Sequence, residues 1–362
     1  MRYYGRHTYE HASSTLTGVL LTNVGTPNAP TPGAVRPYLQ QFLGDPRVIE
    51  YPRWLWWPLL NGIILNTRPR RSAKLYGNVW TEEGSPLLVN LERQGKALQT
   101  ALREQTGVDI PVAVGMRYGE PQLTDVMRRL DQAGVRRLLV VPLYPQYSAT
   151  TTGTALDGVF AELQRWRWLP ELRTITNYHD HPDYIDALAN SVEAFWQEHG
   201  RAERMLFSFH GIPRSYFEQG DPYFCECQKT ARLLAARLGL PEEAYTVSFQ
   251  SRFGPQEWLK PYTDETLEAL GQAGVRSVQV LAPGFSSDCL ETIDELNREG
   301  RESFLEAGGE TFDYIPALND RPDHIKLLAE LVLTHLQGWE LVQPSTAQEH
   351  YDAFQARKER TD

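Results

Sequence analysis

Two side chains that could move protons stand where apolar runs of the sequence end. His210 closes the run "LFSFH", and Glu291 lies in "SSDCLETIDEL". An imidazole with a pKa of about 6.5 accepts and releases protons near neutrality, and a carboxylate can pass them on or guide a cation. As metal ligands, His210 and Glu291 are too few for a closed structural site. The pair therefore predicts proton transfer combined with brief handling of a metal ion.

Both residues also have structural interpretations. A helix that begins near Asp288 would place Asp288, Glu291 and Glu295 at i, i+3 and i+7, on one acidic face that could relay protons or hydrated cations. The same spacing fits a capping box in which Asp288 is the N-cap and Glu291 is its partner three residues later. His210 could equally be a histidine that only satisfies hydrogen bonds. Spacing alone leaves these alternatives open.

An internal repeat separates the two interpretations in part. "TGVLLTNVGTP" resembles "ERMLFSFHGIP", and "QAGVRRLLVVPLYPQYSATTTG" resembles the later "QAGVRSVQVLAPGFSSDCLETIDEL". His210 then corresponds to Val24, and Glu291 corresponds to Thr150 or Thr151. Residues that both halves need for folding should match, so a base and a carboxylate that occur in one half only indicate function.

The elements that must position these residues alternate in type. Continuous apolar runs such as "RRLLVVPLY" and "RSVQVLAPG" are typical of buried parallel strands, and segments such as "LTDVMRRLDQAG" and "DETLEALGQAG" predict helices that end at glycine. This alternation predicts an α/β fold of two similar doubly wound, Rossmann-like parallel-sheet domains, residues 16–155 and 178–330. Ligands of such folds bind beyond the carboxyl ends of the strands, so the active site should lie in the cleft between the domains.

Composition restricts the class of function. The chain has 362 residues, of which 41% are hydrophobic and 23% are charged, and its net charge of −10 argues against broad nucleic-acid binding. Three cysteines cannot form a disulfide framework, and no signal-peptide pattern opens the chain, which together favour the cytoplasm. The "CEC" and "HDH" clusters are weak metal signals, and phosphate-binding loops and nucleophile elbows do not occur. Residues 338–362 predict a polar surface tail.

An apolar segment at about residues 53–65, which contains "WLWWPLLNGIIL", is too short to span a bilayer. It predicts either a helix packed on the sheet or an exposed lip over a large, flat, apolar ligand, and contact with a membrane surface stays open. An apolar platform beside cations suits a flat ligand that bears carboxylates. The cations that follow the segment are Arg68, Arg70, Arg71 and Lys74.

The chain resembles the ferrochelatases, which insert ferrous iron into a porphyrin at the end of haem synthesis. The resemblance covers about residues 17–325, and the lip is most similar to that of proteobacterial members. It is carried, in the family's order, by "VGTPNAPTPGAVRPYLQQFLGDPRV", "LYGNVWTEEGSPL", "PLYPQYSATTTG", "FSFHGIP", "QSRFGPQEWLKPYTDETL" and "PGFSSDCLETIDEL".

The resemblance implies a lyase of the chelatase-like fold that makes protohaem from protoporphyrin IX and Fe²⁺, which is a substrate. It implies that His210 and Glu291 match the active-site histidine and glutamate of the family. The acidic face then makes Asp288 and Glu295 the candidate proton and metal relay. The positions that match porphyrin contacts are Val24, Tyr76, Ser85 and Tyr147.

At some positions the chain differs from members of the family, and these differences limit which cofactors it is expected to bind. Some relatives bind a [2Fe–2S] cluster through four cysteines, so with three thiols we expect no iron–sulfur cluster and no permanently bound cofactor. Cys289 stands where some members have histidine. We expect a monomer in the cytoplasm, with peripheral contact to the inner membrane as an open alternative. The rival functions are a cobalt or nickel chelatase for another tetrapyrrole and a non-catalytic tetrapyrrole or metal carrier.

Overall fold

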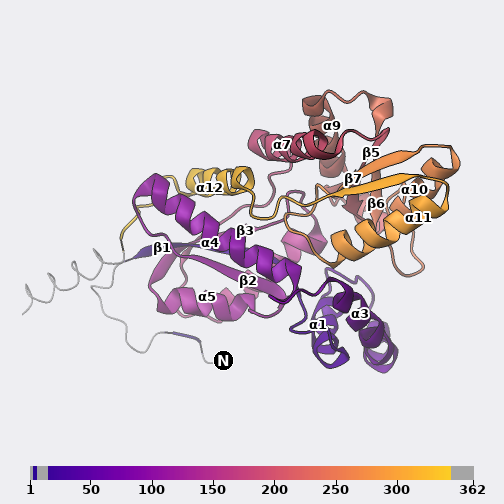
Figure 1. Cartoon of the computed structure of the whole chain (residues 1–362). Coiled ribbons are helices and arrows are strands. Elements are labelled where there is room, and N and C mark those ends of the chain that lie inside the picture. The colour runs from indigo at the N-terminus through magenta and orange to yellow at the C-terminus, as the bar shows by residue number, and fades with distance from the viewer. Residues whose placement is uncertain (1–2, 6–14, 344–362) are drawn as a thin grey trace, which may run out of the picture.

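Two four-stranded sheets form the centre of the computed structural model, which describes residues 3–5 and 15–343 (Figure 1). All strand pairs are parallel, and the strand orders are β2-β1-β3-β4 and β6-β5-β7-β8. Because the order is the same in both sheets, the predicted repeat and the predicted fold are confirmed. The strands are β1 (Leu16–Thr26), β2 (Val112–Gly119), β3 (Val135–Pro142), β4 (Glu171–Thr174), β5 (Arg204–His210), β6 (Tyr245–Gln250), β7 (Ser277–Leu281) and β8 (Thr311–Ile315).

Helices connect the strands of the first unit and extend it beyond the predicted boundary. Residue 155 falls inside a helix, and β4 completes the first sheet, so this unit reaches residue 174. Two of the segments are π-helical, labelled η1 and η2. The helices of this unit are α1 (Pro32–Gly44), α2 (Arg53–Leu59), η1 (Leu60–Ile64), α3 (Leu65–Val79), α4 (Pro86–Thr106), α5 (Leu123–Gln132), η2 (Ala149–Gly153) and α6 (Thr154–Leu163).

The second unit repeats this plan with its own π-helix, η4. The π-helices η2 and η4 occupy corresponding places, each after the third strand of its half, so the repeat extends to an irregular backbone. The helices are α7 (Pro182–His199), α8 (Arg214–Glu218), α9 (Tyr223–Leu238), the 3₁₀ turn η3 (Glu242–Ala244), α10 (Thr263–Gln272), η4 (Glu291–Gly300), α11 (Arg301–Glu306) and α12 (Pro322–Leu336).

The apolar runs are continuous because both faces of each sheet are covered. Successive residues of a strand point to opposite faces, so Leu20 joins a cluster with α5 and α6, whereas Val19 and Leu21 point to the other face. The cluster on that other face also contains Phe207 and Phe209 of β5. The two units therefore share one hydrophobic core.

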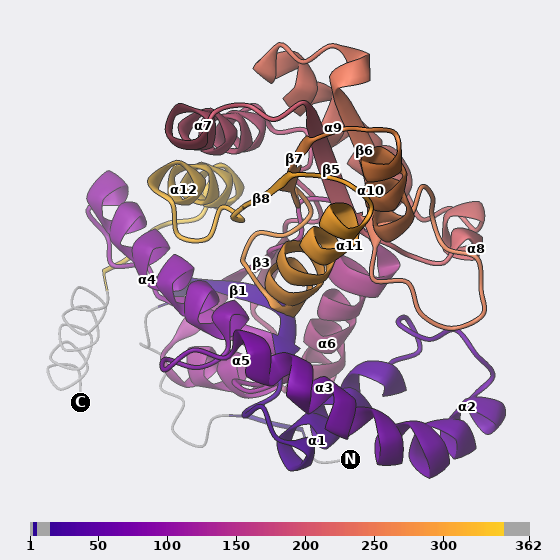
Figure 2. The same cartoon turned by 45° about the vertical axis from the view of Figure 1, so that its right-hand side comes forward.

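Helices α1 to α3 form a separate small group, which we call the lip lobe (residues 32–79; Figures 1 and 2). Its own apolar cluster includes Trp56 and Leu60. Most of the remaining residues of α2 and η1 are solvent-exposed, with Trp54 76% exposed. The alternative of a helix packed on the sheet is therefore wrong, and the exposed lip is the observed form. The exposed large apolar side chains of the lip are Trp54, Leu55, Trp57, Leu59 and Ile63.

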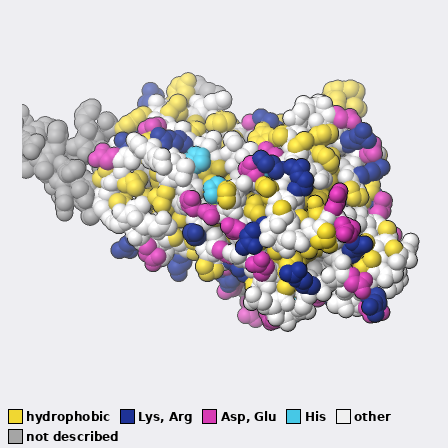
Figure 3. Space-filling view, turned by 90° about the horizontal axis from the view of Figure 1, so that it is seen from above, with side chains coloured by type: hydrophobic (Ala, Val, Ile, Leu, Met, Phe, Trp, Pro, Cys, Tyr) yellow, Lys and Arg dark blue, Asp and Glu magenta, His cyan; other side chains and the backbone are white. Residues whose placement is uncertain are grey.

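On the face in Figure 3, Lys and Arg side chains are interspersed with Asp and Glu side chains. Within residues 3–5 and 15–343, no helix is both long and apolar enough to cross a bilayer. Of the predicted polar tail (residues 338–362), residues 344–362 lie outside the described part of the chain.

Candidate active site

The carboxyl ends of the central strands open onto a cavity between the two units. It has a volume of about 840 Å³, and both units and the lip lobe line it. Loops that follow parallel strands meet at one edge of a sheet, which is where ligands of such folds bind. The cavity therefore lies where the sequence predicted it. The end of β1 contributes lining residues within 23–26, the end of β5 and the loop after it contribute 210–213, and the segments after β3 and β7 contribute residues within 143–146 and 284–291.

His210 is the last residue of β5, and its half-buried side chain lines the cavity. Its Nδ1 atom lies 2.6 Å from the carbonyl oxygen of Gly211. Because a carbonyl only accepts, the neutral ring carries its proton on Nδ1, and Nε2 keeps the lone pair. The ring centroid is 6.4 Å from those of Trp258 and Phe285. His210 thus lies at the cavity wall and is not a histidine of the core.

Glu291 is the first residue of η4 and also lines the cavity. Gln250, the neighbour of His210 across the β5–β6 ladder, donates from Nε2 to the carbonyl oxygen of Glu291 at 3.2 Å. The Oε1 atom of Gln250 accepts a hydrogen bond from Ser208 at 2.8 Å. Gln250 therefore links β5, which carries His210, to the start of η4, which carries Glu291.

The capping-box alternative for Glu291 is wrong. The N-cap of η4 is Leu290, which makes no side-chain capping bond. The backbone N–H of Asp288 donates to Oδ1 of Asn319 at 2.8 Å, so it does not bond the carboxylate of Glu291 as a capping box requires. Glu291 instead lines the cavity.

The helix begins close to Asp288, as expected, but Asp288 lies before its first residue, so its predicted place on one helical face is wrong. Its buried carboxylate accepts hydrogen bonds from Asn319 Nδ2 and Tyr314 Oη, both at 2.7 Å, and from Thr292 Oγ1 at 3.0 Å. Asp288 is not among the residues that line the cavity. This geometry makes Asp288 an anchor for the segment that carries Glu291.

Glu295 lies four residues after Glu291, within the π-helix. Its carboxylate accepts hydrogen bonds from the backbone N–H and the hydroxyl of Ser251, both at 2.6 Å. Ser251 holds a left-handed backbone, with φ of 66°, which is uncommon for a residue with a side chain. Burial, and then the negative charge of Glu291, raise the pKa of Glu295 to about 7 despite these bonds. Glu295 can therefore change its protonation state near neutral pH.

Three of the four positions matched to porphyrin contacts line the cavity. Val24 lies near the end of β1, Tyr76 lies on α3, and Ser85 directly precedes α4. The Ser85 hydroxyl is 2.8 Å from that of Thr26, and the Tyr76 ring meets Tyr38 edge-on at 6.3 Å. Tyr38 also lines the cavity, but no pattern in the sequence identified it.

Tyr147 does not line the cavity, and Tyr144 and Gln146 do so in its place. The backbone N–H of Tyr147 donates to Oε2 of Glu226 at 2.6 Å. This bond from the second unit fixes the direction of the loop. The sequence motif located the loop, but it did not show which of its side chains faces inward.

One cation lies among the described lining residues, which are largely apolar. Arg68 of α3 lines the cavity, with its guanidinium 5.4 Å from the ring centroid of Phe253. Burial, and then the positive charge of Arg71, lower the pKa of Arg68. Arg70, Arg71 and Lys74 are exposed. The predicted pairing of an apolar surface with a cation is therefore present, but Arg68 alone faces the cavity.

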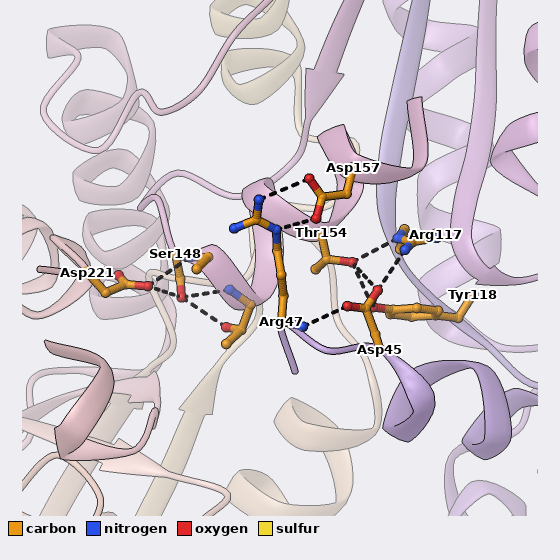
Figure 4. A network of polar contacts seen from close by, with 10 residues as sticks. Asp45, Arg47, Arg117, Tyr118, Ser148, Thr154, Asp157 and Asp221 are labelled. Carbon is orange, nitrogen blue, oxygen red and sulfur yellow. Dashed lines mark hydrogen bonds and ion pairs between the residues drawn. The ribbon is translucent and has the colours of Figure 1, made fainter. Parts of the chain in front are cut away.

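A buried carboxylate holds the wall of the cavity where α1 ends (Figure 4). Asp45 accepts hydrogen bonds from Arg117 at 2.6 Å, from Tyr118 at 2.9 Å and from Thr154 at 3.0 Å. Next to it, Arg47 pairs with Asp157 of α6. These contacts join the start of the lip to β2 and α6 of the first unit.

A second carboxylate in the same view joins the two units through hydrogen bonds (Figure 4). Asp221, between α8 and α9, accepts from Ser148 Oγ at 2.9 Å and from the Ala149 N–H at 2.8 Å. Ser148 is the N-cap of η2, whose Thr150 and Thr151 line the cavity. These threonines correspond to Glu291 in the repeat, so the matched π-helices η2 and η4 both border the cavity, and η4 brings a carboxylate.

The weak metal signals have structural explanations. His181 caps α7, because its Nδ1 accepts the Asp183 N–H at 3.3 Å. Cys225 is exposed, whereas burial raises the thiol pKa of Cys227 and Cys289. In the described part of the chain, no group of three or more His, Cys, Asp and Glu side chains could hold a metal ion. A metal ion at this site would meet the sparse ligands predicted from the sequence.

Comparisons with known proteins agree with this arrangement. The sequence model of the family described as Ferrochelatase matches residues 16–336. A protein named ferrochelatase from Thioalkalivibrio sulfidiphilus is 55% identical over 98% of this chain and 94% of its own length. Another from Marinobacter nauticus is 50% identical over 100% and 98% of the two chains. A third, from Teredinibacter turnerae, is 53% identical over 99% and 97%.

Solved structures support the fold at lower identity. SirB from Bacillus subtilis, solved with Fe³⁺, superposes with a TM-score of 0.50 at 12% identity, covering 69% of this chain and 91% of its own. A multi-domain protein of Deinococcus radiodurans, described as structurally similar to chelatases, has a TM-score of 0.50 at 13% identity, covering 96% of this chain and 61% of its own. At such identities the likeness concerns the fold alone.

Proposed function

The chain belongs to the ferrochelatase family and inserts ferrous iron into protoporphyrin IX to make protohaem in haem biosynthesis, and we propose that His210 and Glu291 carry the chemistry. The observation that carries this proposal is the asymmetry of the cavity. At corresponding positions one half offers Val24 and two threonines, and the other offers an imidazole and a carboxylate. Groups that differ between matched halves and face the same cavity serve the substrate rather than the fold.

The reaction exchanges two pyrrole N–H protons for one Fe²⁺ ion, so the site must accept two protons in each turnover. His210 takes each proton on Nε2, because Nδ1 already donates to Gly211. Glu291 lies on the same cavity wall and passes the proton on, or guides the hydrated cation inward. Glu295, whose pKa is about 7, then receives and releases protons near neutrality. Asp288 keeps the Glu291 segment in place.

The porphyrin must bend before iron can enter, because in a flat ring the nitrogen lone pairs point toward the centre of the plane. Aromatic side chains from both units line the cavity, among them Tyr38, Trp258 and Phe285. We propose that contacts with these walls are best for a bent macrocycle, so that binding energy favours the distorted form. Flat haem then fits less well and leaves.

We propose that Arg68 selects the porphyrin by binding the carboxylates on the rim of the ring. It is the one Lys or Arg among the described lining residues, and its planar guanidinium suits a carboxylate. We expect kcat/KM for protoporphyrin, with two carboxylates, to exceed that for coproporphyrin, with four, by about tenfold or more, because unpaired carboxylates lose hydration in an apolar cavity. The test mixes the protein with Fe²⁺ and each porphyrin under anaerobic conditions.

The same assay separates an enzyme from a carrier. Many equivalents of haem per protein are expected, whereas a non-catalytic carrier stops at one. A faster reaction with coproporphyrin would contradict the role of Arg68, and a reaction that proceeds with cobalt or nickel but not with iron would contradict ferrochelatase activity itself.

We further propose that the lip contacts an anionic membrane surface. Its exposed apolar side chains lie beside the exposed cations Arg70, Arg71 and Lys74, the combination that binds interfaces. Trp54→Gln should weaken binding to vesicles containing phosphatidylserine by about tenfold, since it removes a large apolar side chain from the interface. Sedimentation with vesicles measures this.

Leu169→Gln is the matched control. Leu169 is 56% exposed and stands two residues before β4, so it lies at the amino end of the strand, away from the cavity. Equal loss of vesicle binding in both variants would show that general surface hydrophobicity, rather than the lip, mediates the binding.

A further inference from the structure

A tyrosine of the second unit reaches across the edge of the cavity to the lip lobe. The hydroxyl of Tyr216, on α8, donates to the carbonyl oxygen of Val48 and accepts the backbone N–H of Glu50, both at 3.3 Å. The Tyr216 ring is buried, and all three residues line the cavity. This hydroxyl therefore closes one edge of the cavity between the lip and the loop that follows His210.

The lip lobe is held firmly by the first unit and loosely by the second. On the first side, the charged bond between Asp45 and Arg117 is 2.6 Å long, and the guanidinium of Arg47 donates to the carboxylate of Asp157 on α6 at 3.0 Å. Charge-assisted bonds of these lengths are stronger than a neutral bond at 3.3 Å. The Tyr216 contact is therefore the weaker attachment.

One other hydrogen bond joins the lobe to the second unit within the described residues. It runs from Asn78 Nδ2 to Asp294 Oδ1 at 3.1 Å, near the end of α3. Val48 and Glu50 lie instead just before α2. If both Tyr216 bonds break, the edge of the lip beside α2 loses its hydrogen bonds to the second unit while the end of α3 keeps its own.

The other side of the contact is rigid. The backbone of Gly211 bonds Gln250 at 2.8 Å, and that of Arg214 bonds Glu257 at 2.9 Å, so the segment from His210 to α8 is fastened to the end of β6 and to the loop that follows it. Tyr216 consequently keeps its place relative to His210. Movement at this edge belongs to the lip.

We propose that Tyr216 is a positioning residue that holds the lip lobe against the segment bearing His210 while porphyrin is bound, and that breaking its two hydrogen bonds lets haem leave. The inference rests on the proposed function, because haem is the product considered. Tyr216 acts through the lip and takes no part in proton transfer. The effect should therefore concern binding and release rather than the chemical step.

Tyr216→Phe tests the proposal, because it removes the hydroxyl and keeps the ring. Haem dissociation should become about tenfold faster, and KM for porphyrin should rise by a similar factor, as expected for the loss of two weak hydrogen bonds. The single-turnover rate on bound porphyrin should change by less than about twofold. Stopped-flow spectroscopy measures both rates.

Hydrogen exchange provides a readout that does not depend on activity. The Glu50 amide donates to Tyr216, so its exchange should accelerate in Tyr216→Phe. Tyr178→Phe is the control, because the buried Tyr178 hydroxyl has no hydrogen-bond partner among the described residues. This control should change neither exchange at Glu50 nor haem release.

Unchanged haem release in Tyr216→Phe would overturn the proposal, whether or not exchange at Glu50 becomes faster. A slower single turnover with unchanged release would also overturn it, since Tyr216 would then act on the chemical step. The wild-type protein in the same assay tests the proposed function separately. If it makes no haem, that function fails, whereas exchange at Glu50 and dissociation of added haem still report on Tyr216.

Discussion

His210→Ala is expected to slow iron insertion by about 10³-fold, within the range that loss of a general base produces, while porphyrin binding changes little. Nε2 of His210 is the nitrogen that can accept pyrrole protons, because Nδ1 is bonded to Gly211. The largely apolar cavity walls that bind the macrocycle remain in the variant. Anaerobic turnover measures the rate, and quenching of porphyrin fluorescence measures the affinity.

The exposed histidine at the end of α7 provides the control. His199→Ala removes an imidazole outside the cavity and should leave turnover unchanged. Added imidazole should restore part of the activity of His210→Ala, since the truncation leaves space at the wall. Turnover close to that of the wild type in His210→Ala would refute the role of His210 as the base.

Glu291→Gln is expected to lower turnover by about 10²-fold, at the lower end of acid–base effects, without changing the melting temperature. The amide keeps the size of the side chain but can neither carry a proton onward nor attract Fe²⁺. A residue with only a capping role would instead cost about 1 kcal/mol of stability and leave the activity largely intact. Thermal melting and anaerobic turnover together distinguish the two.

A control lies on the same π-helix. Glu299 is exposed and bonds Arg298 at 2.8 Å, so Glu299→Gln should leave the rate unchanged. Because the charge of Glu291 contributes to the raised pKa of Glu295, Glu291→Gln should also lower that pKa. Full activity combined with a lower melting temperature would reject the catalytic role.

The fold was predictable because burial on both faces of a sheet leaves continuous apolar runs in the sequence. Leu20 and its neighbours face two different clusters, so the strand reads as a continuous apolar run. The repeat then assigned equivalent positions, and Val24 and His210 both line the cavity as expected. These features depend on short-range pattern and on comparison within the chain.

The site was less predictable where long-range hydrogen bonds decide the direction of a side chain. Glu226 turns the loop at Tyr147, and Asn319 takes the Asp288 N–H that a capping box would use. Neither partner is close in the sequence. The spacing from Asp288 to Glu295 likewise assumed an α-helix, whereas the segment is π-helical and begins later. Local spacing carries no information on such partners.

Proteins with two lobes often swing shut about a linker, which requires each lobe to keep its own interior. Here Val19 and Leu21 of one sheet and Phe207 of the other belong to the same buried cluster. A rotation of one half relative to the other would therefore disrupt a shared hydrophobic core. Changes in the shape of the cavity are therefore left to the helices of the lip lobe. The two sheets should therefore stay fixed relative to each other while the lip lobe adjusts, so that the proposed bending takes place in the tetrapyrrole rather than in the walls that the sheets form.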